Sequence, residues 1–141
     1  LFSEMGNTVV AISPDSKALY HAAAVMVSNQ IVALADMGTA LLVKCGFSEA
    51  AAAEALSPLL LGNAQSVAEK GAVNALTGPI ERGDAQTVSK HLQEIRKFAA
   101  ESTVGQDILT AYTALSKQLI RIARQKHPHK DYKHLEKELE Q

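Results

Sequence analysis

Apolar positions follow two patterns along this chain, one short β-type run near its start and helical spacing through the rest. Residues 8–12 (TVVAI) predict a strand, and no second run of β-branched residues follows residue 16. A lone strand leaves its backbone donors and acceptors unpaired. We therefore expect its sheet to belong to sequence that precedes residue 1, and the chain to be the C-terminal part of a larger protein.

A long helix is predicted over residues 17–45, with start signals at residues 14–16 and Gly46 as the residue that ends it. No Asp, Glu, Lys or Arg occurs from residue 18 to residue 35, and apolar side chains lie on every side of the helix. Such a helix is typically buried all round. A membrane span is the alternative interpretation, and several polar side chains oppose it: His21, Ser28, Asn29, Gln30 and Asp36.

The rest of the chain predicts amphipathic helices around this central one. Ser48 caps a second helix, which Pro58 breaks or kinks before it ends at Gly71. A third helix follows Asp84, and a fourth covers residues 103–125. The expected inward positions are Ala85, Val88, Leu92, Ile95 and Ala99 in the third, and Val104, Ile108, Ala111, Leu115, Leu119 and Ile122 in the fourth.

Composition excludes several function classes. A net charge of -1 and a pI near 6.6 provide no basic field for nucleic acid or anionic lipid. Cys45 is the only cysteine, so an internal disulfide and a cysteine-based zinc site are excluded, and a reducing, cytoplasmic location is expected. The sequence motifs of nucleotide, metal and nucleophile sites are absent.

The first candidate site is a polar spot on the long helix, formed by His21, Ser28 and Asn29. In a functional interpretation His21 is a general acid or hydrogen-bond donor to a carbonyl substrate that Asn29 or Ser28 positions. The alternative is a core histidine with satisfied hydrogen bonds and amide bonds between helices. Residue types alone leave both open.

The second candidate site is the loop of residues 77–84 (TGPIERGD). Gly78 permits close backbone approach, Pro79 stiffens the turn, and Arg82 offers a planar fork to a carboxylate or phosphate. Asp84 caps the next helix and can pair with Arg82, so the turn would suit an anionic substrate. The alternative, which the residues by themselves favour, is an ordinary turn between helices. No metal site is expected at the histidines around Pro128, which are His127, His129 and His134.

Three segments, YHAAAVMVSN (20–29), LTGPIERGD (76–84) and DAQTVSKHL (84–92), resemble the DUF2520 family of oxidoreductase-like proteins. The resemblance covers residues 17–125. It implies an N-terminal Rossmann domain that binds NAD(P), followed by an all-helical domain similar to those of 6-phosphogluconate dehydrogenase, ketopantoate reductase and pyrroline-5-carboxylate reductase.

The resemblance implies an all-α bundle around one long buried helix, with a remnant strand at its start. Residues 1–16 would end the Rossmann domain, 17–126 would form the substrate and dimerisation domain, and 127–141 would form a charged tail or surface helix. The expected partners are a second copy of the chain and a small anionic substrate, without nucleic acid or membrane. NAD(P) is expected on the full-length protein and not on this fragment alone.

The resemblance also suggests residue roles. The relatives use a Lys followed four residues later by Asn on the long helix; His21 stands in place of the Lys, and Val25 departs from the Asn. The implied proton donor to a carbonyl or imine receiving hydride is then His21, with Asn29 orienting the substrate. The implied substrate contacts are Ser28, Thr77, Gly78, Pro79, Arg82 and Asp84. The competing hypothesis is a non-catalytic helical dimerisation or ligand-binding module, and an upstream GxGxxG-bearing βαβ region would discriminate the two.

Overall fold

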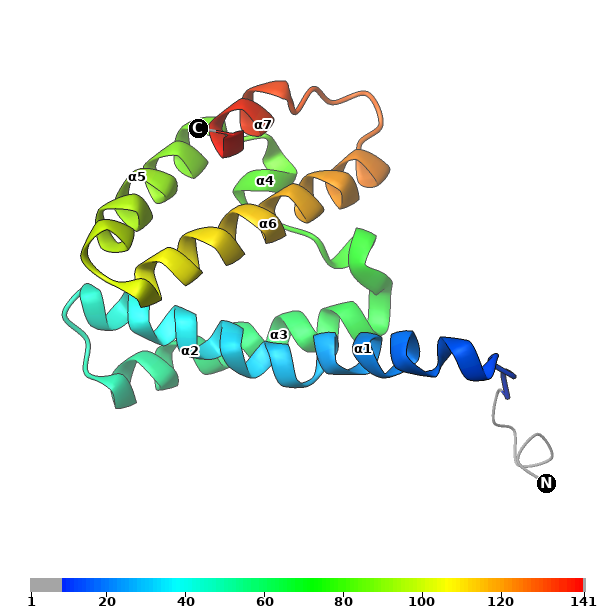
Figure 1. Ribbon diagram of the computed structural model, residues 1–141. Coiled ribbons are helices and arrows are strands. Elements are labelled where there is room, and N and C mark those ends of the chain that lie inside the picture. The colour runs from blue at the N-terminus through cyan, green and yellow to red at the C-terminus, as the bar shows by residue number, and fades with distance from the viewer. Residues whose placement is uncertain (1–8, 141) are drawn as a thin grey trace. The chain divides into compact units, whose positions relative to one another are not determined.

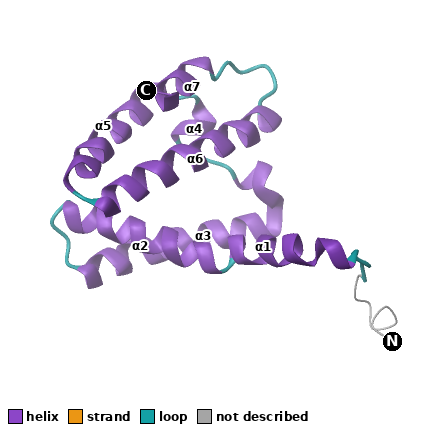
Figure 2. Ribbon diagram, in the orientation of Figure 1, coloured by secondary structure: helices purple, strands orange, loops and turns teal. Residues whose placement is uncertain are grey.

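The computed structural model describes residues 9–140 and divides the chain into two compact units, Leu1–Glu49 and Ala50–Gln141. The described part is all-α: helices joined by short turns, with no strand between residues 9 and 140 (Figure 2). This confirms the expected fold class at the coarse level and corrects two finer expectations.

The remnant strand is absent from the residues that the structure describes. Val9, Val10 and Ile12 have no regular structure and are 61%, 75% and 49% exposed, while residue 8 lies outside the described part. The physical reason is the lack of a pairing partner. Extended backbone becomes a strand only beside a pairing partner, and residues 9–140 offer none.

The first unit consists of a 3-10 turn, Pro14–Ser16, and two helices, α1 (Lys17–Val27) and α2 (Asn29–Lys44) (Figure 1). Ser28 separates the helices with φ -112° and ψ -76°. Its hydroxyl donates to the Ala24 carbonyl at 2.7 Å, and its amide still donates to the same oxygen at 3.1 Å. Such back-bonding from serine bends helices, so the predicted continuous helix is two helices in close succession.

The expectation that the long helix is buried is wrong. Neither α1 nor α2 contains a buried residue, and Leu19, Tyr20 and Val27 are 75%, 65% and 77% exposed. A helix is buried all round only if other elements surround it, and the described part of this unit holds no further helix or strand to do so. Pro14–Lys44 is also long and apolar enough to cross a membrane, with a mean hydropathy of 1.4.

The second unit begins with α3 (Glu49–Ala75), most of which is exposed. The helix continues through Pro58 and is interrupted at Gly71, where φ is 72° and ψ is 163°. A left-handed φ of this kind suits glycine because it has no Cβ. The predicted end at Gly71 therefore corresponds to a kink, after which one more helical turn leads to Leu76, whose amide donates to the Ala72 carbonyl.

The core of this unit lies among α4 (Pro79–Arg82), α5 (Ala85–Glu101), α6 (Thr103–Lys126) and α7 (Lys133–Glu140). In Figure 1, α5 and α6 form a helical hairpin, with α4 and α7 beside the end of the hairpin opposite its connecting turn. The buried cluster consists of Leu76, Ile80, Val88, Leu92, Ile120, Ala123, Tyr132, Leu135 and Leu139. Residues from the charged C-terminal segment thus complete the core.

The predicted inward face of α5 agrees with the structure, since Val88, Leu92, Ile95 and Ala99 are buried. The predicted face of α6 agrees in part: Ile108 is buried and Leu119 and Ile122 pack against the core, whereas Val104 and Leu115 are 47% and 42% exposed. The buried positions of α6 are Gly105, Ile108, Ser116, Ile120 and Ala123.

Candidate functional site

The first polar spot is exposed. His21 lies on α1, Ser28 lies between the helices, Asn29 begins α2, and none of these residues is buried. The Ser28 hydroxyl lies 3.0 Å from Asn29 Oδ1 and donates to it, so these two side chains are in contact. His21 is therefore not the core histidine of the alternative interpretation. It presents an imidazole at the surface of the first unit.

The loop of the second spot is a tightly hydrogen-bonded turn in the second unit. Gly78 (φ 97°) precedes α4, and Gly83 (φ 72°) ends it in the left-handed region. The Arg82 amide donates to the Gly78 carbonyl at 3.1 Å, and the Asp84 amide donates to the Pro79 carbonyl at 2.8 Å. Ile80 is 5% exposed and anchors the turn in the core. Thr77 and Arg82 remain exposed.

Asp84 caps α5 as the sequence predicts. Its carboxylate accepts from the Thr87 amide at 3.0 Å and from the Thr87 hydroxyl at 2.7 Å. These two hydrogen bonds, helped by the charges of Arg82 and Lys90, hold the pKa of the Asp84 carboxyl below its ordinary value. The N-terminus of α5 thus already has a carboxylate from its own chain.

Glu81 is the most heavily contacted residue of the turn, and the sequence analysis had assigned it no role. His127 Nε2 lies 2.5 Å from Glu81 Oε1, and Lys126 Nζ lies 3.9 Å from the same oxygen. The Tyr132 hydroxyl donates to the Glu81 carbonyl at 3.0 Å, and Lys130 reaches the same carbonyl at 3.5 Å. The His127 contact, with the charges of Lys126 and Lys130, lowers the pKa of the Glu81 carboxyl.

A further contact ties the same segment to the start of the turn. Lys126 Nζ donates to the Leu76 carbonyl at 2.7 Å. The partners of these contacts are 46 to 51 residues apart, so no local spacing in the sequence relates them. The signal in the sequence is a thin apolar stripe of Tyr132, Leu135 and Leu139 in the charged C-terminal segment, because such a stripe needs a core to cover it. Among residues 9–140 no group of three or more His, Cys, Asp or Glu side chains is placed to hold a metal ion.

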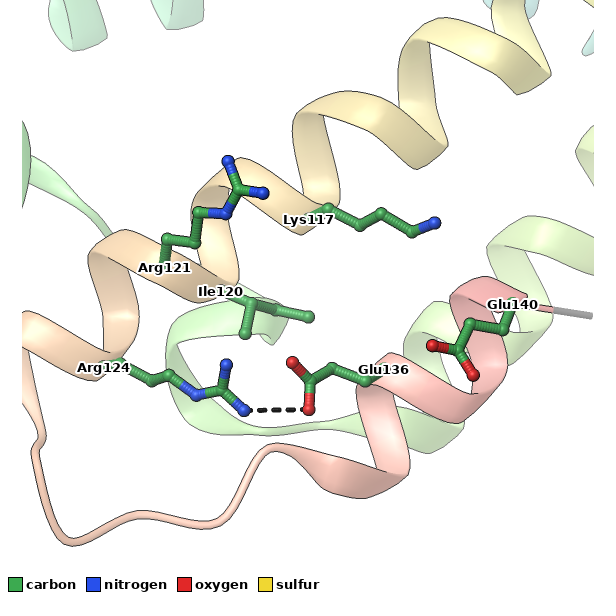
Figure 3. Close-up of a pocket in the computed structure, with 6 residues that line it drawn as sticks. All are labelled: Lys117, Ile120, Arg121, Arg124, Glu136 and Glu140. Atoms are coloured by element: carbon green, nitrogen blue, oxygen red, sulfur yellow. Dashed lines mark hydrogen bonds and ion pairs between the residues drawn. The ribbon is translucent and has the colours of Figure 1, made fainter.

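A separate surface pocket of about 200 Å³ lies between α6 and α7 (Figure 3). Its lining is Lys117, Ile120, Arg121, Arg124, Glu136 and Glu140. Arg124 points across the pocket to Glu136, with which it forms an ion pair at 2.8 Å (Figure 3). Because both side chains are partly exposed, the pair contributes little to stability, and none of the sequence-predicted site residues lines this pocket.

A Rossmann site holds the pyrophosphate on a glycine-rich turn between a strand and a helix. Residues 9–140 contain no strand, and the sequence contains no GxGxxG.

Comparison with known families identifies residues 1–119 as a Domain of unknown function (DUF2520). The match spans most of the chain, so the protein belongs to the DUF2520 family. No curated protein and no solved structure match it. The matched region includes both candidate sites and ends before Lys126, His127, Lys130 and Tyr132, which hold the turn in place.

Proposed function

We propose that this DUF2520 domain is the substrate-side and dimerisation domain of a cytoplasmic NAD(P)-dependent oxidoreductase that acts on a small carbonyl or imine acid. The observation that supports this most is the construction of the turn at residues 77–84. Its two acidic side chains are engaged, Glu81 with His127 and Asp84 with Thr87. Arg82, between them, is exposed on a hydrogen-bonded backbone.

Arg82 is the proposed anchor for the anionic group of the substrate. A guanidinium presents two parallel N–H donors to a carboxylate, and a rigid backbone reduces the entropy lost on binding. Thr77 would add a hydroxyl donor beside it, while Gly78 and Pro79 shape the backbone and Asp84 fixes the following helix. Arg82 is thus the basic residue of the turn, and its neighbours shape the backbone that presents it.

His21 is the proposed proton donor, with Asn29 as orienter and Ser28 as its support. The support for Ser28 is its hydrogen bond to Asn29 Oδ1, which restrains the amide and leaves the NH₂ group to donate elsewhere. His21 is exposed, as a group that exchanges protons with a substrate must be.

The first test is calorimetric titration of NADH and NADPH into the full-length gene product and into this fragment. We expect binding only by the full-length protein, with His21→Ala leaving that binding intact. Absence of cofactor binding by the full-length protein would refute the oxidoreductase proposal.

If cofactor binds, steady-state rates with a panel of small 2-oxo and imine acids test Arg82. Arg82→Ala should raise KM at least about tenfold while cofactor affinity stays unchanged, since a charge-assisted contact to substrate is lost. Arg121→Ala is the matched control, because Arg121 is also exposed in this unit and its guanidinium donates to the Gln118 side chain. Equal effects of the two variants would contradict a substrate role for Arg82.

A second candidate function, a non-catalytic dimerisation module, has its own support in the exposed first unit. The uncharged stretch from residue 18 to residue 35 carries strongly exposed apolar side chains, including Leu19, Met26, Val27 and Val32. Soluble proteins seldom leave such a surface uncovered. A second copy of the chain is the proposed cover, in keeping with the dimerisation that the family resemblance implies.

Sedimentation velocity over a wide concentration range tests the dimer. We expect a concentration-dependent dimer that Val27→Lys weakens, whereas Val104→Lys, at an exposed position of α6, leaves it intact. A monomer at every concentration would refute dimerisation. Flotation with neutral lipid vesicles that Val27→Lys abolishes would show instead that the stretch enters a bilayer.

A further inference from the structure

The contacts on Glu81 form a clasp between two distant parts of the chain. We use this name for residues 126–132, the last residue of α6 and the segment after it, which lie against α4. The clasp makes three contacts: through Tyr132 with the Glu81 carbonyl and through His127 with the Glu81 carboxylate, both on α4, and through Lys126 with the carbonyl of Leu76, which precedes the turn. Figure 1 shows α4 beside the C-terminal part of α6.

The three contacts differ in their response to protons. Lysine and tyrosine side chains keep their protonation state from weakly acidic to weakly alkaline pH, whereas an imidazole gains or loses its proton in that range. The charged or titratable groups that face the Glu81 carboxylate are Lys126 and His127 at the end of α6, with Lys130 and Tyr132 on the following segment. The Glu81–His127 contact is therefore the proton-sensitive one.

We propose that the Glu81–His127 contact is a pH-sensitive latch, which tightens the clasp on α4 when His127 is protonated and loosens it when His127 is neutral. A protonated imidazole forms a charge-assisted hydrogen bond to a carboxylate, roughly twice as strong as a neutral one. The latch controls how firmly the backbone that carries Arg82 is held. It does not depend on the chain being part of an oxidoreductase.

The latch has a second, acidic limit. Because the pKa of the Glu81 carboxyl is lowered from 4.5, its carboxylate persists through weakly acidic pH and is lost only at lower pH. Only between these limits are a negative Glu81 and a positive His127 present together. The clasp should therefore hold α4 most tightly in weakly acidic solution and less tightly at lower and at higher pH.

Amide hydrogen exchange followed by NMR on this chain reads the latch directly. The reporters are the amides of Arg82, Gly83 and Asp84, all hydrogen-bonded within the turn, and the control is the Ile120 amide in the core. Protection is corrected for intrinsic exchange and compared from about pH 4 to pH 8. We expect protection of the turn to fall about threefold from its maximum on the alkaline side, since His127 and Glu81 are only partly buried.

Three variants separate the latch from general destabilisation. His127→Gln should remove the alkaline fall, because glutamine can donate a hydrogen bond without changing charge. His129→Gln, at an exposed position of the clasp, should behave like the parent chain. Tyr132→Phe removes only the hydroxyl that donates to Glu81, so it should lower protection at every pH while the dependence on pH keeps its shape.

Two results would overturn the latch. One is protection of the turn that is equal at weakly acidic and weakly alkaline pH in the parent chain. The other is a His127→Gln variant in which the Ile120 amide loses as much protection as the turn, because the contact would then support the whole unit and not α4.

Discussion

Gly105 provides the sharpest test of how α5 and α6 pack. The two helices are joined by the single extended residue Ser102, whose hydroxyl accepts from the Gly105 amide at 3.0 Å. So short a connection brings the first turn of α6 against the last turn of α5. A Cβ at position 105 would lie 2.4 Å from the Phe98 carbonyl oxygen and 2.6 Å from the Ala99 nitrogen. Both are backbone atoms, which cannot move away by a change of rotamer.

The expected destabilisation follows from these distances. Carbon and carbonyl oxygen atoms normally approach to roughly 3.3 Å, so Gly105→Ala must separate the helices locally by close to one ångström. Overpacking of this kind costs about 1–3 kcal/mol. Alanine recovers at most about 1 kcal/mol through its better helix propensity. We expect a net loss of about 1–2 kcal/mol in the free energy of unfolding.

Urea unfolding followed by circular dichroism measures this loss as a lower midpoint, by about 1 M for a protein of this size. Gly62→Ala is the matched control. Gly62 is also helical and exposed, and a Cβ there meets nothing within 4 Å. Alanine at position 62 should therefore be neutral or stabilising by up to about 1 kcal/mol. Equal midpoints for the two variants would refute the close approach of α5 and α6.

Three further changes test the second unit. Leu135→Ala should lower the free energy of unfolding by about 2–5 kcal/mol. Leu59→Ala should change it little, because Leu59 is 63% exposed and Leu135 only 1%. Equal losses in urea unfolding would place α7 outside the core. Gly83→Ala should cost about 1–2 kcal/mol for the left-handed φ of 72°, with crowding against Lys130 Cε at 3.1 Å added, again measured in urea. Because the pKa of the Asp84 carboxyl is lowered on folding, its stabilising effect is present above the ordinary value of 3.8 and is lost as pH falls through the folded-state pKa. In Asp84→Asn, the urea midpoint should therefore depend less on pH over that acidic range.

The amphipathic helices were predictable because their information is local. In α5, apolar residues at helical spacing mark the buried face, and polar residues fill the other. In α6 the same reasoning found Ile108 but missed Gly105 and Ser116, because it gave no weight to small residues. Small residues can be buried where two backbones come close, and a hydrophobic pattern does not reveal such positions. At Gly105 the burial comes from the close approach to α5.

For the long helix, the sequence pattern did not determine what surrounds it, and the expectation of burial was wrong. An uncharged segment with apolar residues on all sides is compatible with a buried core helix, a membrane span and an interface awaiting a partner. Composition is the same in all three, and only the surroundings distinguish them. In this chain α1 and α2 contain no buried residue, so the partner that would cover them is not found within their unit.

The turn at residues 77–84 was recognised from its residue types, but the assignment of its charges needed the fold. Glu81 and Arg82 are neighbours in the sequence, and only the contacts with His127, Lys126 and Tyr132 show that Glu81 faces the C-terminal segment. The carboxylates of Glu81 and Asp84 are both hydrogen-bonded, to His127 and to Thr87. An anion approaching the turn would therefore meet an exposed guanidinium whose acidic neighbours already have partners. This is why Arg82→Ala and Glu81→Gln should differ: the first removes the charge itself, and the second releases the backbone that presents it.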